Sequence, residues 1–413
     1  MKADEADALA LVLIPACAVA APLLSDRVYR WLAVPTVVFE IVVGVLIGPD
    51  VLDLAQVGDL VESLSQFGLA LLMFLAGYEI DFARLRGGPL GRAVTAWSIT
   101  LVIALGVGAL FNRDPLNGAF VGLALTTTAL GTILPILRDS GDLPTPFGSM
   151  AMATGAVGEF GPIIAIALLL SGNRPLKSAV ILGAFALITA VAVGYARRPR
   201  PAWVTRVIRR TLRTSGQFAV RTVVLVLAVM VGAAISLSLD MLLGAFTAGI
   251  VSRLLLNEVP EAEEEVIEAK LEAIGFGFLV PIFFVVSGMN FDLDALLSDP
   301  GTLLLVPLFL LSFVLLRGVP ATLLAPPELP GRDRIALGLY GSTALPLVVV
   351  ITTIEVEAGR LPSSTAAALV GAGMLSVLIL PLLGQRVRGG TAKPPPPPPP
   401  TPDGSRRERA ESW

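Results

Sequence analysis

Polar residues interrupt the long apolar stretches of this sequence at three places where they could bind an ion. The stretch TTTALGTILP occupies 126–135, and the shorter GSTALP occupies 341–346. The third is Glu159, which lies inside MATGAVGEFGPIIAIALLL between Gly158 and Gly161. Hydroxyls, carboxylates and the carbonyls of an unwound helix all offer oxygen ligands, so these residue types predict cation binding.

Glu159 is the residue with the clearest chemistry. A carboxylate in the middle of an apolar span is costly and usually marks an ion or proton pathway. It holds either a proton or a metal cation, and the two ligands therefore compete for one group. The alternative is a structural Glu paired with a basic residue, for which Arg317 in FVLLRGVPA is the candidate. Both interpretations can hold together, because Arg317 could pair with the carboxylate when neither a proton nor a cation is bound to it.

The composition indicates a membrane protein. Of the 413 residues 54% are hydrophobic and only 15% are charged, and the mean hydropathy is +0.80. A soluble chain carries about 25% charged residues. A membrane-spanning helix needs about 20 apolar residues. Thirteen segments meet this requirement, at 9–24, 31–48, 64–80, 92–111, 116–138, 147–171, 177–195, 218–237, 240–256, 272–289, 302–324, 333–354 and 363–384.

The basic residues predict how these spans are oriented. The connections that follow spans 1, 3, 5, 7, 9 and 11, together with the C-terminal tail, contain 23 of the 30 Lys and Arg residues. Lys and Arg are retained on the cytoplasmic side of a membrane. We therefore expect the N-terminus outside and the C-terminus inside.

An internal repeat relates the two halves of the chain. Span 3 ends in GYEIDFARL and span 10 in GMNFDLDAL, and Gly77 and Gly288 stand 211 positions apart. The tetrads that begin at Thr127 and Ser342 stand 215 apart. The two members of each pair lie seven spans apart, and an odd number of spans reverses the direction through the membrane. The six-span repeats are therefore inverted, and span 7 connects them. Inverted repeats with matched broken helices, here spans 5 and 12, are typical of secondary transporters. We expect Thr127, Thr128, Glu159, Ser342 and Thr343 to form the cation site.

The connecting segments carry less information. The stretch 196–217 contains seven Arg residues, and apolar residues at helical spacing predict an amphipathic helix on anionic lipid. The stretch 258–272 is acidic, and a solvated helix face is the simpler interpretation. Residues 386–413 contain seven consecutive prolines and predict a disordered, basic cytoplasmic tail. The sequence has no G-x-G-x-x-G motif that would bind a dinucleotide, and we expect no cofactor.

Four motifs resemble one family of transporters. VPTVVFEIVVGVLIGP, MFLAGYEIDF, GAFTAGIVS and PIFFVVSGMNFDLDAL, in this order, are similar to the sodium/hydrogen exchanger domain of the monovalent cation:proton antiporter-2 family. The resemblance covers about 20–385. It implies an elevator-like homodimer with crossed spans 5 and 12 and a carboxylate on span 6. Within a transmembrane domain of 1–385 it suggests a core of spans 3–6 and 10–13, a dimerisation scaffold of spans 1–2 and 8–9, and a connecting span 7.

The sequence departs from the family pattern at the carboxylate. Members usually carry Asp, Asn or Gln before an Asp, whereas this chain has Gly158 and Glu159. Members with two acids also tend to carry a Lys on span 10, and span 10 of this chain has none. These differences favour electroneutral exchange of one proton for one Na⁺ or K⁺ in the plasma membrane. We therefore predict a transporter rather than an enzyme, with no nucleic-acid partner. Two alternatives stay open: a sodium-coupled organic-anion symporter, and a transport-inactive membrane sensor or scaffold.

Overall fold

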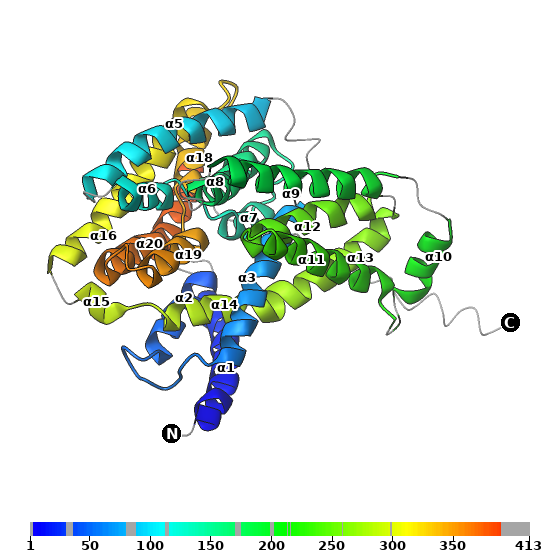
Figure 1. Ribbon diagram of the computed structural model, residues 1–413, viewed down its shortest axis with the longest axis horizontal. Helices are drawn as coiled ribbons and strands as arrows, with labels where there is room; N and C mark the ends of the chain where they lie inside the picture. Colours follow the sequence, from blue (N-terminus) through cyan, green and yellow to red (C-terminus); the bar gives the residue numbers. More distant parts are fainter. Residues whose placement is uncertain are drawn as a thin grey trace.

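The computed structural model of the protein describes residues 3–29, 36–79, 88–111, 115–169, 175–198, 202–212, 214, 216–257, 259–297 and 300–389 (Figure 1). These residues form helices and loops and contain no β-strand. Nine of the described helices are long and apolar enough to cross a membrane. The predicted all-α, multi-pass membrane protein is therefore confirmed.

The first half of the chain contains α1 (Ala3–Tyr29), α2 (Thr36–Ile47), α3 (Asp59–Glu79), α5 (Gly88–Phe111), α6 (Pro115–Ala124), α7 (Leu130–Asp139), α8 (Pro146–Leu169), α9 (Pro175–Ala196) and α10 (Ala202–Thr211). The second half contains α11 (Phe218–Ser236), α12 (Met241–Leu256), α13 (Glu261–Ile274), η1 (Gly275–Leu279), α14 (Val280–Met289), α15 (Leu293–Leu297), α16 (Pro300–Phe313), η2 (Val314–Gly318), α17 (Val319–Leu323), α18 (Gly331–Gly341), α19 (Pro346–Glu357) and α20 (Ser363–Arg388).

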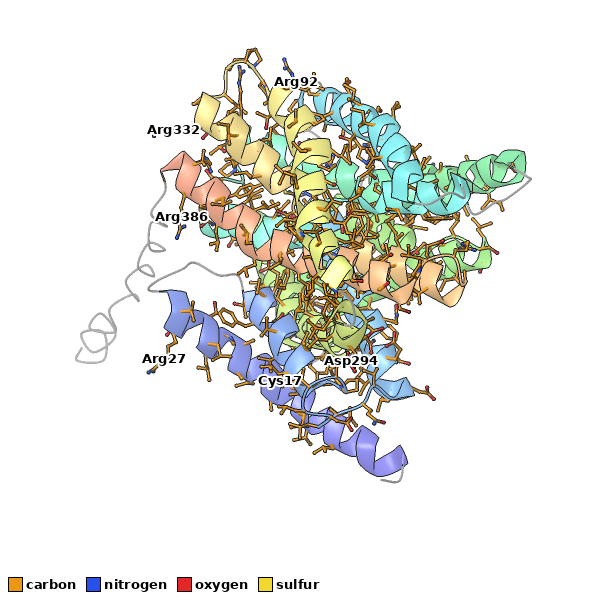
Figure 2. The ribbon with its side chains drawn as sticks, turned by 90° about the vertical axis from the view of Figure 1, so that its left-hand side faces the viewer. Cys17, Arg27, Arg92, Asp294, Arg332 and Arg386 are labelled. Carbon is orange, nitrogen blue, oxygen red and sulfur yellow. The ribbon has the colours of Figure 1, made fainter. Side chains whose placement is uncertain are left out.

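Two helical segments are broken where the sequence predicted it. The stretch 125–129 separates α6 from α7, and 342–345 separates α18 from α19. Each of the thirteen predicted spans overlaps one helix or a run of two or three consecutive helices in the described part. Figure 2 shows Arg27, Arg332 and Arg386 along one side of the molecule, as the predicted orientation requires. The span count and the orientation themselves stay predictions.

Reciprocal glycine contacts join two repeat-related pairs of helices. Gly77 of α3 and Gly249 of α12 each lie against a backbone carbonyl of the other helix. Gly44 of α2 and Gly288 of α14 make the same reciprocal contact. Spans 3 and 10 correspond in the predicted repeat, and so do spans 9 and 2, so one contact is the repeat copy of the other. A side chain at any of the four positions would collide with backbone, which is why small residues allow this close approach.

Spans 3 and 10 pack against helices of the predicted scaffold. The predicted domain assignment places both spans in the core, while α3 packs mainly on α12 and α14, and α14 packs mainly on α2 and α3. The helices α5, α6, α8, α16, α18, α19 and α20 form a second group, at the upper left of Figure 1. Helix α9 contacts α12 in one group and α8 in the other. The glycine contacts explain the packing of spans 3 and 10, because they fix α3 and α14 to scaffold helices.

The last helix continues past the predicted end of the membrane domain. α20 ends at Arg388, which donates hydrogen bonds to Asp142 and Asp333, and Gly389 follows with a φ of 77°. These contacts place the first three residues of the predicted tail in the helix. The remainder of that tail, from residue 390, lies outside the described residues.

Candidate ion-exchange site

The two broken helices meet at their breaks. The backbone N–H of Ala129 donates to the carbonyl oxygen of Thr343 over 2.6 Å. The hydroxyl of Thr128 donates to the carbonyl oxygen of Gly341 over 2.7 Å. Unwinding a helix leaves backbone groups unpaired, and here the two breaks supply partners to each other. The structure thus brings together the two tetrads that are far apart in the sequence.

Glu159 lies beside this crossing and is fully buried, with an exposed fraction of 0%. Its Oε2 accepts a hydrogen bond of 2.8 Å from the backbone N–H of Leu130. Leu130 is the first residue of α7. The N-terminus of a helix carries a partial positive charge that favours an anion. A second bond, from the N–H of Thr128 to the carbonyl of Gly158 at 2.9 Å, ties the same break to α8.

The other carboxylate oxygen of Glu159 has no partner. Oε1 is buried and accepts no hydrogen bond from the described residues. A buried polar atom without a partner costs about 1–3 kcal/mol, and more when the group is charged. Binding a proton or a cation at Oε1 would remove that cost, so this atom is the point at which a ligand would gain most.

Arg317 is buried next to Glu159 but does not pair with it. The side chain is 1% exposed and belongs to the π-helical segment η2. Its Nε and Nη2 donate to the hydroxyl of Thr128, at 3.0 and 2.6 Å, and Nη2 also donates to the carbonyl of Thr154, at 3.2 Å. No ion pair within 4.0 Å joins the two described side chains of Glu159 and Arg317. Arg317 therefore holds the break at Thr128, and its influence on Glu159 is indirect.

Glycine at position 158 makes room for this arrangement. A Cβ on Gly158 would collide with the guanidinium of Arg317 and with the side chain of Thr128. The residue before the carboxylate therefore has a steric role.

The remaining predicted ligands stabilise the broken ends. The hydroxyls of Thr127, Ser342 and Thr343 donate to carbonyls of their own helices, at 2.8, 2.8 and 3.4 Å. All three residues are buried. None of these bonds reaches Glu159, so the hydroxyls contribute to the shape of the crossing, and each keeps a lone pair that can face a cation.

Three further residues support the site and were missed by sequence reasoning. The hydroxyl of Thr100 on α5 donates to the carbonyl of Leu316 at 2.6 Å and so satisfies a backbone group of the π-helical segment that carries Arg317. Ser376 on α20 accepts the N–H of Ala344 at 2.9 Å. Thr154 offers its carbonyl to Arg317. Isolated Thr and Ser residues in apolar helices carry no sequence signal that distinguishes them from packing residues.

The opposite end of α7 is held by charge. Arg138 pairs with Glu79 at the end of α3 and with Glu268 and Glu272 on α13. Glu268 and Glu272 belong to the acidic stretch 258–272, for which the sequence predicts a solvated helix face. The structure instead makes them partners of the helix whose other end contacts Glu159.

A cavity of about 600 Å³ lies between the two groups of helices. It is lined by α3, α12 and α14 on one side and by α19 and α20 on the other. Its lining includes Glu62, Asp240 and Asp292, and the described lining residues include no Lys or Arg. Glu159 is not part of the lining, so this acidic cavity stops short of the buried carboxylate.

Comparisons with known proteins identify relatives along the whole membrane domain. YjbQ of Bacillus subtilis (strain 168) is 26% identical over 392 residues, which are 90% of this chain but only 62% of YjbQ. The Na(+)/H(+)-K(+) antiporter GerN of Bacillus cereus is 26% identical over 270 residues, which are 63% of this chain and 67% of GerN. This chain thus spans less than two thirds of the length of YjbQ.

The fold has a counterpart among solved structures. The sodium proton antiporter MjNhaP1 from Methanocaldococcus jannaschii superposes with a TM-score of 0.66, covering 93% of this chain and 97% of that one, at 14% identity. Such a low identity supports the fold alone. Residues 16–387 also match the family described as "Sodium/hydrogen exchanger, transmembrane". The match covers most of the chain, which therefore belongs to the transmembrane sodium/hydrogen exchanger family.

Proposed function

We propose that the protein is a monovalent cation:proton antiporter of the cell membrane, in which a proton and Na⁺ or K⁺ alternate on Glu159. The observation that carries this proposal is the unpartnered Oε1 of a fully buried carboxylate at the crossing of two broken helices. The family membership and the printed name of GerN support it.

The proposed exchange is electroneutral. Among the described residues Glu159 is the one carboxylate at the crossing. It gives up one positive charge when the proton leaves and takes up one when the cation binds. Arg317 keeps its hydrogen bonds to Thr128 and Thr154 and therefore need not change its charge. One proton would then be exchanged for each cation, with oxygens near Thr127, Thr128, Ser342 and Thr343 completing the cation's coordination.

We further propose that transport moves the two packed groups of helices past each other. The mobile group would contain the crossing and Glu159, and the static group would contain α1, α2, α3, α11, α12, α13 and α14 and form a homodimer contact. The cavity between the groups supports this division, because its walls come from both. The proposed static group includes spans 3 and 10, because α3 packs mainly on α12 and α14 packs mainly on α2.

Flux in proteoliposomes tests the proposal. Vesicles loaded with a pH-sensitive dye should show proton flux driven by an Na⁺ or K⁺ gradient, and Glu159→Gln should abolish it while the protein remains folded. Unchanged flux in that variant would overturn the role of Glu159. Sodium-dependent uptake of an organic anion without proton flux would instead indicate a symporter. Normal flux after deletion of residues 390–413 would exclude an essential role of that segment in transport.

A further inference from the structure

The basic stretch between α9 and α11 folds with its apolar side against the protein. Ile208 and Leu212 are buried in one cluster with side chains of α9, α11 and α13. The sequence predicted that these residues lie on lipid, as part of an amphipathic helix. The structure confirms a helix, α10, but its apolar face is already covered by protein.

The face of α10 that remains exposed combines two arginines with an aromatic residue. Trp203, Arg206 and Arg210 follow one another at helical spacing on the side opposite Ile208 and Leu212, and all three are exposed. Arg206 and Arg210 form no ion pair with a described residue. The stretch 196–217 contains no acidic residue at all, so nothing within it neutralises this face.

Contacts to α13 fix the direction of this face. Arg209 pairs with Glu263 at 2.8 Å. Lys270 donates to the carbonyl of Leu212 and to the side chain of Gln217, the latter at 2.8 Å. These bonds hold the C-terminal half of α10 and the turn that follows it, and the helix presents Trp203, Arg206 and Arg210 as one surface.

The position of α10 places this surface at the rim of the membrane. The two helices that α10 joins expose apolar side chains to their surroundings, including Leu187 and Val191 of α9 and Val224 and Leu225 of α11. Figure 1 shows α10 at the outer edge of the molecule, beyond the ends of these helices. Aromatic residues concentrate at the depth of lipid headgroups, and basic residues beside a membrane attract anionic lipid.

We propose that Trp203, Arg206 and Arg210 form a docking surface for anionic phospholipid headgroups. Charge complementarity selects this ligand, since a zwitterionic headgroup offers no net charge to the two exposed guanidinium groups. Arginine binds phosphate oxygens through two parallel N–H groups, and the indole of Trp203 fits the interface between headgroups and acyl chains.

Thermal unfolding of the full-length protein in detergent tests the proposal. Added phosphatidylglycerol should raise the Tm of the wild type more than phosphatidylcholine does, and Arg206→Gln/Arg210→Gln should lose this difference. The matched control is Arg332→Gln/Arg386→Gln, which removes two exposed arginines elsewhere (Figure 2) and should keep it. Equal losses in the two double variants would overturn the proposal, and so would an equal shift with inorganic phosphate.

Fluorescence gives a second readout that a purely structural role would not change. Brominated phosphatidylglycerol should quench the wild type more strongly than brominated phosphatidylcholine, and Trp203→Phe should remove that excess. If the excess quenching persists in Trp203→Phe, the lipid binds at another tryptophan and the proposed surface is wrong.

Discussion

The backbone N–H of Leu130 donates to Oε2 of Glu159 over 2.8 Å, and this bond links the buried carboxylate at the crossing to the start of a broken helix. The other end of the same ten-residue helix is held through Arg138. A shift of α7 would therefore change the surroundings of Glu159 directly. The ion site and the charged contacts at the far end of α7 belong to one rigid element.

The bond from Leu130 predicts different outcomes for two substitutions of Glu159. Glu159→Asp keeps a carboxylate but shortens it by one methylene, so it should lose the contact with Leu130 while still exchanging a proton for a cation. We expect measurable flux with a raised apparent KM for the cation. Glu159→Gln should abolish flux because it holds no exchangeable charge. Equal flux in the two variants, measured with a pH dye in proteoliposomes, would contradict this account.

Gly158→Ala should disturb the contact between Arg317 and Thr128. The added methyl group has no room between the two side chains, and overpacking of this kind costs about 1–3 kcal/mol. We expect a lower Tm and a large loss of flux. The control is Gly106→Ala on α5, where a Cβ meets no atom within 4 Å. Similar losses in both variants would show that Gly158 has no special role.

Sequence reasoning found the breaks and the carboxylate because these features are local. A Ser/Thr-Thr-Ala-Leu tetrad inside an apolar span and a Glu in mid-span are visible without a fold. The partners of Arg317 were not predictable, because the choice between Glu159 and Thr128 depends on side-chain geometry across three helices. The packing partners of spans 3 and 10 were not predictable either, since nothing in the sequence around Gly77 and Gly288 indicates which helix each glycine contacts.

Arg138→Gln should weaken the far end of α7. Glu79, Glu268 and Glu272 would lose their shared cation, and three carboxylates in contact repel one another. We expect a destabilisation of about 1–2 kcal/mol, seen as a lower Tm. Arg209→Gln, which breaks a single more exposed pair, serves as the comparison and should cost less than about 1 kcal/mol. A larger effect for Arg209→Gln would contradict the assignment.

Acid should weaken the contact between Asp142 and Arg388. Burial raises the pKa of Asp142, but hydrogen bonds from Arg388 and Ser140 outweigh it, and the pKa lies below its usual value of 3.8. A carboxyl whose pKa is lower in the folded state stabilises the fold above its unfolded pKa, and this contribution is lost as the pH falls through the folded pKa. Asp142→Asn should therefore lower the Tm at pH 7, and the difference from the wild type should shrink below about pH 4. A difference that is independent of pH would exclude this ion pair as its source.

Electroneutral exchange predicts that flux is independent of membrane voltage. One carboxylate at Glu159 carries either one proton or one cation, so each cycle moves no net charge, whereas a second titrating group would make the cycle electrogenic. The measurement is sodium-driven proton flux in proteoliposomes with and without a thiocyanate gradient, which sets a voltage without adding a transported cation. We expect the same rate at both voltages, and a rate that follows the voltage would require a second proton-carrying group. Glu40 on α2, 6% exposed, would then be the first residue to substitute, because it is a buried carboxylate in a membrane-spanning segment that the proposed exchange does not use.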